Sequence, residues 1–391
     1  PEVCILNLKH FQMQTTLFLF TDNSLQSHNG GATADVSKTH LVLGFGGKEV
    51  INTQPVYPAL KSKFPNAHIV LCSTAGEIIN NRVNDNTVSV AAIELEKTTI
   101  RPVTVNIRDF ENSYEAGKSL IKLIDFNDLA YILVISDGSN VNGSELVRGI
   151  NELVNDRVPV TGGLAGDGTN FQSTLVGLNE EPSGGNIVAI PFYGNSFVVS
   201  HASMGGWEIF GPERTVTKAV ANQLFEIEGQ KALDLYKTYL GTYADELPGS
   251  ALLFPLGIKI NEDDEPIVRT ILSIDQETGS MVFAGDIPNG SKVRFMKANF
   301  DKLVDAATNA AGQAFQKLPA APQLALLISC VGRKIILGKR TEEEVEAVAD
   351  TFGSKTLLTG FYSYGEISPF NDNAKCELHN QTMTITTFDE L

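Results

Sequence analysis

Residues 324–333 read LALLISCVGR, an apolar run followed by a short loop of mostly small and polar residues. A helical stretch follows near Glu342–Phe352, and a second apolar run, Thr356–Leu358, leads into the turn 359–366, TGFYSYGE. Two apolar runs joined through a helix favour parallel strands with a right-handed crossover. The stretch therefore predicts a βαβ unit whose loops lie at the carboxyl ends of its strands, where open α/β sheets bind ligands.

Two earlier parts of the chain repeat this order loosely. Each copy reads as a strand, a loop with glycine, a helix, a second strand, and a turn in which glycine precedes an acid. The alternative is three unrelated βαβ units. The first copy has strands at 41–43 and 68–72, a helix near Val56–Phe64 and the turn STAGE at 73–77; the second has strands at 131–135 and 158–160, a helix near Ser144–Asn155 and the turn TGGLAGD at 161–167.

Between the copies, pairs of apolar runs separated by short turns predict antiparallel strands. Residues 87–95 with 99–107, and 186–192 with 196–203, read as hairpins, while 251–260 and 266–274 bracket the acidic turn 261–265. The expected fold class is thus mixed α/β, with βαβ units whose strands are parallel, antiparallel hairpins and two related domains. The predicted divisions are an N-terminal extension with a first strand (1–38), an N-terminal domain (39–229) and a C-terminal domain (230–391).

Composition excludes several classes of function. The 391 residues include 30 Lys and Arg against 46 Asp and Glu, a net charge of −16. An acidic chain without a basic run lacks the electrostatic footprint of a nucleic-acid binder and does not favour anionic membranes. Four cysteines in this length do not form a disulfide framework. Residues 1–6 lack the basic segment and the long apolar region that are typical of a signal peptide, and no apolar run is long enough to span a bilayer. We expect a cytoplasmic protein.

Several motifs, in order, resemble those of the FIST family of bacterial intracellular signal-transduction proteins, with its N-terminal and C-terminal modules. The resemblance covers nearly the whole chain from about Thr39 onward. The two most distinctive motifs are GFYSYGEI at 360–367 and CELHNQTMT at 376–384. The others are STAGEI at 73–78, TGGLAGD at 161–167, GPERTVT at 211–217 and SCVGR at 329–333.

The resemblance implies a sensor module for a small ligand. Amino acids are one class of ligand that it implies, and haem that responds to nitric oxide is another. The implied partner is a histidine kinase or a cyclic-di-nucleotide enzyme. Because no such output segment is evident in this chain, we expect the partner to be a separate protein.

The residues themselves suggest how an amino acid would bind. Arg333, after the end of a buried strand, would clamp a carboxylate or a haem propionate with two parallel hydrogen bonds. Glu366, in the closing turn of the same copy, would accept an ammonium group, with Tyr362 or Tyr364 as a wall. The alternative is that Arg333 and Glu366 pair with each other or are solvated. The further ligand-binding candidates come from the same motifs: Cys330, Gly365, Gly163, Asp167, His379 and Asn380.

His379 and His201 are the candidate axial ligands of a haem, since histidine is the commonest proximal ligand. His379 precedes the expected strand 381–388, and His201 lies in the run 198–204. The alternative for His379 is structural, namely that His379, Asn380 and Gln381 hydrogen-bond the neighbouring glycine-acid turn and hold the site together.

Catalysis is the alternative class of function. Cys330 is the best thiol candidate for a small-molecule hydrolase or transferase, because Arg333 nearby would lower its pKa and His379 would be its base. A small residue packed at the end of a buried strand explains Cys330 equally well. The leading prediction is a ligand sensor without catalytic activity, and a pure interaction scaffold is the third possibility.

Overall fold

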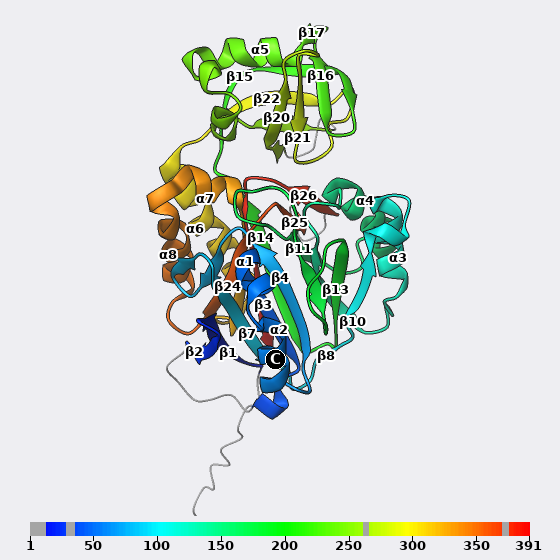
Figure 1. Ribbon diagram of the computed structural model, residues 1–391, viewed down its shortest axis with the longest axis vertical. Helices are drawn as coiled ribbons and strands as arrows, with labels where there is room; N and C mark the ends of the chain where they lie inside the picture. The colour runs from blue at the N-terminus through cyan, green and yellow to red at the C-terminus, as the bar shows by residue number, and fades with distance from the viewer. Residues whose placement is uncertain (1–12, 29–35, 261–265, 370–374) are drawn as a thin grey trace, which may run out of the picture.

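The computed structural model describes residues 13–28, 36–260, 266–369 and 375–391. The expected acidic turn at 261–265 and the first twelve residues of the expected extension lie outside these ranges. The described chain forms a body of three mixed sheets and an upper domain with an antiparallel sheet of its own (Figure 1). The mixed α/β fold class is therefore confirmed.

Three βαβ units form the centre of the body, as the internal repeat predicts. The two strands of each unit are parallel neighbours, paired from Leu41↔His68, Ile132↔Val160 and Leu324↔Leu357 onward. In the third unit the expected loop after the first strand is a short helix instead. The first unit comprises β3 (Leu41–Gly47), α1 (Lys48–Thr53), α2 (Val56–Lys63) and β4 (His68–Thr74); the second β10 (Leu129–Ser136), α4 (Gly143–Val154) and β11 (Val160–Leu164); the third β23 (Leu324–Cys330), α7 (Val331–Leu337), α8 (Thr341–Phe352) and β24 (Leu357–Ser363).

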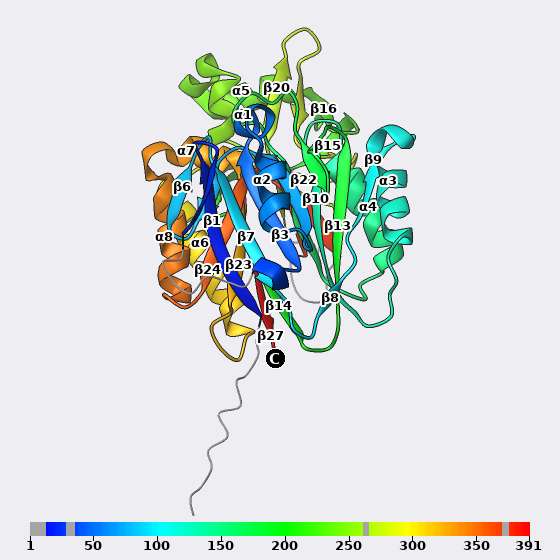
Figure 2. The ribbon, with the colours of Figure 1, turned by 60° about the horizontal axis from the view of Figure 1, so that its bottom comes forward.

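Local sequence explains where the principal helices begin. The side chain of Asn142 accepts the Glu145 N–H at 3.1 Å and caps α4, and Asn299 caps α6 (Phe300–Gln316) through the Lys302 N–H at 3.3 Å. Each cap satisfies an N–H group that has no partner inside the helix. The helices of the three units lie on the outside of the body and leave its strands in the centre (Figures 1 and 2).

Each unit passes the chain on to the sheet of another unit. After β4 the chain enters the third unit's sheet as β5 (Glu77–Ile79), and after β24 it enters the second unit's sheet as β25 (Gly365–Pro369). After β11 it enters the first unit's sheet as β12 (Val176–Leu178). These exchanges close a ring, so every sheet of the body includes a strand from a different unit.

The strand orders of the body are β12-β4-β3-β7-β1-β2, β26-β25-β11-β10-β13-β8 with β9 beside β13, and β14-β27-β23-β24-β5-β6. The remaining elements of the body are β1 (Gln14–Thr21), β2 (Ser24–Ser27), β6 (Arg82–Asn84), β7 (Val88–Glu94), β8 (Thr99–Ile100), β9 (Val103–Asn106), α3 (Ser113–Lys122), β13 (Asn186–Tyr193), β14 (Phe197–Met204), β26 (Cys376–His379) and β27 (Met383–Glu390).

The two hairpins expected at 87–107 and 186–203 do not form. β7 pairs with β1 and β3, whereas β8 and β9 pair with β13 in another sheet. β13 and β14 likewise belong to different sheets. Alternation and a short turn predict two neighbouring strands, but they cannot show that the turn crosses from one sheet to the next.

A shared apolar core lies between the three sheets. It includes Phe45 and Leu43 of the first unit, Leu133 of the second and Leu326 of the third, all at most 1% exposed. The ring of Phe45 stacks on that of Phe361 from the third unit, with centroids 4.9 Å apart. The three units thus share one central core, and each unit also packs against its helices in an apolar cluster of its own.

The upper domain has its own sheet, in the order β19-β18-β22-β15-β16-β21-β20, and its own core, with Leu224, Tyr236 and Phe283 fully buried. The predicted domain boundary between residues 229 and 230 lies within this sheet, at the turn from β16 to β17. The elements are β15 (Glu208–Val220), β16 (Gln223–Ile227), β17 (Gln230–Lys231), α5 (Ala232–Leu240), β18 (Leu256–Lys259), β19 (Ile267–Arg269), β20 (Ile271–Asp275), β21 (Ser280–Phe283) and β22 (Lys292–Lys297).

Candidate functional site

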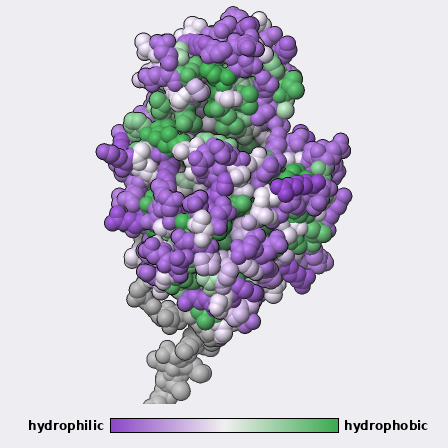
Figure 3. All heavy atoms as spheres, viewed as in Figure 1, coloured by the Kyte–Doolittle hydropathy of each residue, from purple (hydrophilic) through white to green (hydrophobic). Residues whose placement is uncertain are grey.

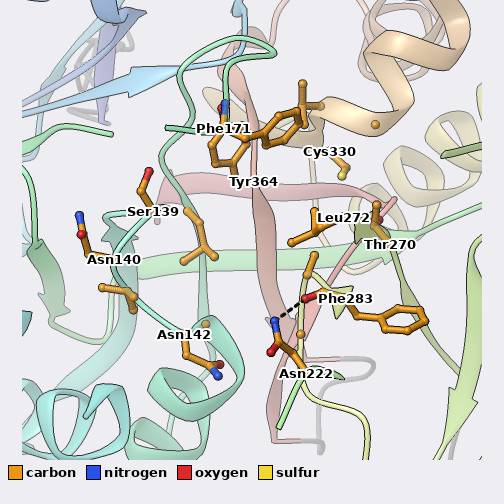
Figure 4. A pocket seen from close by; sticks show the side chains of 18 of the residues that line it. Ser139, Asn140, Asn142, Phe171, Asn222, Thr270, Leu272, Phe283, Cys330 and Tyr364 are labelled. Carbon is orange, nitrogen blue, oxygen red and sulfur yellow. Dashed lines mark hydrogen bonds between the residues drawn. The ribbon is translucent and has the colours of Figure 1, made fainter. Parts of the chain in front are cut away.

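A cavity of about 370 Å³ lies where the upper domain meets the body. The segment 138–143, from the loop after β10 to the start of α4, and residues 330–332, at the end of β23 and the start of α7, contribute to its wall on the body side. Asn222, Thr270 and Phe283 are among the residues of the opposite wall (Figure 4). The carboxyl ends of two units therefore meet at one site. On the visible surface, apolar side chains gather at this junction (Figure 3).

The fully buried carboxylate of Asp137 organises the loop after β10. Its Oδ1 accepts the N–H groups of Ser139 and Asn140 at 2.7 and 2.6 Å. Its Oδ2 accepts the Gly185 N–H at 2.7 Å and the Nδ2 of Asn140 at 3.1 Å. Four charge-assisted hydrogen bonds fix the loop that lines the cavity.

Tyr364 and Phe171 lie together in the cavity wall, with rings stacked at a centroid distance of 4.7 Å (Figure 4). The Tyr364 hydroxyl donates to Asp167 and accepts the Phe171 N–H at 3.1 Å. Burial pushes the pKa of Asp167 up, but bonds from Tyr364, Ser173 and Gln172 and the nearby Lys48 outweigh it and hold the pKa below its usual value. Asp167 is thus an anchor of this wall.

Hydrogen bonds of Asp286 and Arg269 join the upper domain to the body beside the cavity. Asp286 accepts a hydrogen bond from the Nδ2 of Asn142 at 3.1 Å, at the start of α4. Arg269, 5% exposed, donates from Nη1 to the Leu378 carbonyl at 2.8 Å. Burial lowers the pKa of Arg269 to about 10, so the guanidinium remains charged at neutral pH.

Two buried polar side chains, one in the cavity wall and one behind it, have no hydrogen-bond partner among the described residues. Thr270 lines the cavity with 5% exposure, and its Oγ1 is unpartnered. Both amide atoms of the fully buried Gln381 are also unpartnered, and they lie against Gly332, where an added Cβ would be 2.4 Å from Nε2. Such groups in a native fold call for an explanation, because an unmade buried hydrogen bond is costly.

Comparison with known families identifies both halves of the chain. The FIST N domain matches residues 40–230 and the FIST C domain matches residues 232–369. The chain belongs to the FIST family. FIST domains are generally small-ligand sensor domains in signalling.

Two relatives are uncharacterized proteins of Mycobacterium tuberculosis, from two strains. Each is 26% identical to this FIST protein over 237 residues, which are 59% of this chain and 60% of the relative. The chain therefore matches these curated relatives over about three fifths of their length.

Arg333 does not lie open at the rim of the FIST site, as the carboxylate clamp requires. It is fully buried and forms a salt bridge of 2.8 Å with Glu344 of α8. Its Nη1 and Nη2 also donate to the carbonyls of Gly205 and Leu303 at 2.7 and 2.8 Å. Neither alternative considered for it, pairing with Glu366 or solvation, matches this arrangement, because α8 supplies the acid.

Glu366 is engaged inside the turn that follows β24. Ser363 donates to its Oε1 at 2.6 Å, and the N–H and hydroxyl of Thr382 donate to its Oε2 at 3.2 and 2.9 Å. In the first unit, Thr74 and Thr87 bind Glu77 in the same way. The repeated pattern indicates that the acid of the glycine-acid turn fixes the exchanged strand. Burial raises the pKa of Glu366 to about 8 and that of Glu77 to about 7.

Three further candidates lie beneath the cavity rather than in its wall. The Tyr362 hydroxyl donates to Glu344 at 2.8 Å. Gly163 pairs with Glu366 between β11 and β25, and an added Cβ there would lie 2.7 Å from Ile328. Gly365 pairs with Leu164 in the same ladder. Close packing of strands explains both glycines.

The two candidate haem ligands do not line the cavity. The Nε2 of His379 contacts the Ser368 carbonyl at 2.8 Å, and burial lowers the pKa of His379 to about 4. Asn380 donates to the carbonyl of His379 at 3.1 Å. His201 lies within β14 and is 4% exposed. These positions do not fit a haem in the cavity, so haem stays a prediction from the family.

Cys330 is the candidate that reaches the cavity directly, together with Tyr364 (Figure 4). Burial raises the pKa of the Cys330 thiol, and the nearby Glu366 raises it further. A thiol in this environment is a poor nucleophile, because the thiolate is the reactive form. The geometry therefore gives the catalytic alternative no support.

Sequence reasoning missed the part of the wall that the upper domain contributes. Thr270 and Phe283 lie far from the motifs in sequence, and Asn222 follows the motif at 211–217 without belonging to it. Asn140 had a usable signal, because an acid followed by small residues after a buried strand is typical of an Asx turn. Phe171 had a weaker one, as an aromatic residue within a polar loop.

Proposed function

We propose that this protein is a cytoplasmic sensor whose small ligand binds in the cavity between the upper domain and the body. The observation that carries the proposal is the cavity itself, which is assembled from the ends of two βαβ units and from a separate domain. Ligand sites form preferentially at such junctions and at the carboxyl ends of strands. A ligand bound there contacts the upper domain and the body at the same time, so that its binding affects both, as a sensor requires.

The finer predictions from the family belong to this proposal. An amino acid is one ligand class to test, although Arg333 and Glu366 are already engaged and other groups would have to bind it. Haem with nitric oxide is the second, and it would need a site other than the cavity wall. The proposed output is a separate histidine kinase or cyclic-di-nucleotide enzyme. Among the described residues, no helix is both long and apolar enough to cross a bilayer.

The test is retention of small molecules from a bacterial metabolite extract by the full chain. Leu272 lines the cavity and is 49% exposed, so Leu272→Trp narrows the opening without disturbing a core. Ile260→Trp, at a residue that is 48% exposed and does not line the cavity, is the matched control. We expect wild type and Ile260→Trp to retain the same molecules by mass spectrometry and Leu272→Trp to lose them. Equal retention by all three proteins would refute the cavity as the sensory site.

A further inference from the structure

We propose that the cavity selects an uncharged ligand that carries a ring and N–H or O–H donors, of the class of carboxamides and cyclic amides. This inference rests on the proposed function and names the ligand chemistry of the same site. Three observations support it: the side chains that line the cavity carry no charge, the hydroxyl of Thr270 has no partner, and the side-chain oxygens of Asn140 and Asn222 are available to accept a hydrogen bond from a ligand.

The wall offers no counter-ion to a charged ligand. None of the described residues that line the cavity is Asp, Glu, Lys, Arg or His. The nearest charged side chains are bonded to other groups. Asp137 accepts from its loop, Asp167 from Tyr364, and Asp286 from Asn142. The Arg269 guanidinium, which lies behind Gly285 of the wall, donates to the carbonyls of Leu378 and Asp286. Transfer of an ion from water into such a site is costly without a partner, so both charged ends of a zwitterion are disfavoured.

The polar groups of the wall present mainly acceptors. Asn140 uses Nδ2 to bind Asp137, and Asn222 uses Nδ2 to bind the Phe283 carbonyl at 2.8 Å (Figure 4). Their Oδ1 atoms receive no hydrogen bond from a described residue and are available to a ligand. Together with the Thr270 hydroxyl, which both donates and accepts, they match an N–H or O–H group beside a carbonyl.

The rest of the wall is apolar or aromatic. Leu164, Leu252 and Phe283 line it together with the stacked pair Phe171 and Tyr364. A cavity of about 370 Å³ has room for one ring with its substituents. A flat ring would pack its faces on these apolar and aromatic side chains and direct its polar edge toward the hydroxyl of Thr270.

Three probes with the same ring and different charge test the inference on the full chain. They are benzamide, which is neutral, benzoate, an anion, and benzylamine, a cation. We expect saturation-transfer NMR to show benzamide binding at least about ten times more tightly than either ion, a difference expected when a buried charge has no partner. Tighter or equal binding of benzoate or benzylamine, or no binding of benzamide, would overturn the inference.

The hydroxyl of Thr270 is tested by Thr270→Val, which keeps the shape of the side chain. The loss of one hydrogen bond should weaken benzamide binding about three- to tenfold, and Thr270→Ser, the matched control, should retain it. Unchanged affinity of Thr270→Val would mean that this hydroxyl has a purely structural role, and the inference would be wrong.

A charge placed on the wall should change the selectivity. Because Leu272 is half exposed, Leu272→Glu should gain affinity for benzylamine and Leu272→Lys for benzoate, while Leu272→Gln stays selective for benzamide. Failure of the ligand class and failure of the proposed function remain distinguishable. Charged molecules retained from the extract and lost in Leu272→Trp would refute the class alone, whereas retention that does not depend on the cavity would refute the function.

Discussion

The buried charged residues that the sequence suggests as ligand-binding groups stabilise the fold instead. Arg333 and Glu366 were the two side chains most suited to an amino acid by their chemistry, yet both make their hydrogen bonds to neighbouring elements. A buried ion pair is strongly destabilising when one partner is removed, because the other charge stays uncompensated.

Arg333→Met should therefore lower the free energy of unfolding by about 3–5 kcal/mol, the range for breaking a buried pair. Urea denaturation measures the loss. The control is Arg82→Met, which breaks a surface pair with Glu342 whose side chains are 62% and 40% exposed and should cost less than about 1 kcal/mol. Similar losses in both variants would contradict the buried role of Arg333.

Glu366 gives the protein a pH dependence of known sign. Burial raises its pKa from 4.5 to about 8, so the folded state holds a proton that the unfolded state has released. The stabilisation from this difference is present at low pH and is lost as the pH rises through the folded value. The window is therefore from about pH 4.5 to about pH 8.

The free energy of unfolding of wild type should fall relative to that of Glu366→Gln across this window, by at most about 1.4 kcal/mol per pH unit. Urea titrations of both proteins at four pH values measure the difference. The comparison with the variant removes the contribution of His379, whose pKa is lowered by burial and whose effect on stability has the opposite sign. A difference that does not vary with pH would contradict a buried, protonated Glu366.

At the scale of elements, the loop after β10 depends on one carboxylate. Asp137→Ala removes four hydrogen bonds, so the amide hydrogens of Ser139, Asn140 and Gly185 should exchange faster and benzamide binding should weaken. Asp137→Asn keeps an acceptor for Ser139 and Asn140 but opposes a donor to the Gly185 N–H, so it should be intermediate. Hydrogen-exchange mass spectrometry measures the order, and equal protection in all three proteins would contradict it.

The close approach of β23 and β24 requires a glycine. At Gly360 the backbone has φ +154°, and an added Cβ would lie 1.8 Å from the Leu327 carbonyl oxygen. Gly360→Ala should therefore prevent folding or destabilise severely. Gly312 in α6 has open space around it, so Gly312→Ala should stabilise by about 0.5–1 kcal/mol. Thermal denaturation of the two variants should move in opposite directions.

Prediction from sequence worked for elements defined by local patterns. The apolar runs near Leu324 and Tyr131 and the helix near Glu342 were placed well, because periodicity and caps act over a few residues. The sequence could not show which sheet a strand joins after a turn, since a hairpin turn and a turn that crosses to another sheet have similar sequences. The partner of Arg333 was missed because the face of α8 that carries Glu344 is fixed by packing.

At the scale of the whole molecule, the upper domain and the body differ in whether their sheets are built from one continuous segment of the chain. Residues 208–297 contain all strands of their sheet and the residues of their core, whereas each sheet of the body needs strands from distant parts of the chain. A fragment of residues 208–298 should fold cooperatively by circular dichroism and urea denaturation. A fragment of residues 39–229 should not, because β11 lacks β25 and β5 lacks β24. Cooperative folding of the second fragment would contradict the interdependence of the sheets.

The ring of exchanged strands also constrains synthesis. β27, which ends at Glu390 of the 391 residues, lies between β14 and β23, and β25 closes the sheet of the second unit. A chain emerging from the ribosome in order therefore exposes β11 until β25 has been made, and β14 until β27 has been made. Unpaired strand edges of this kind favour aggregation. Translation speed and chaperone supply should thus limit the yield of this protein more than its final stability does.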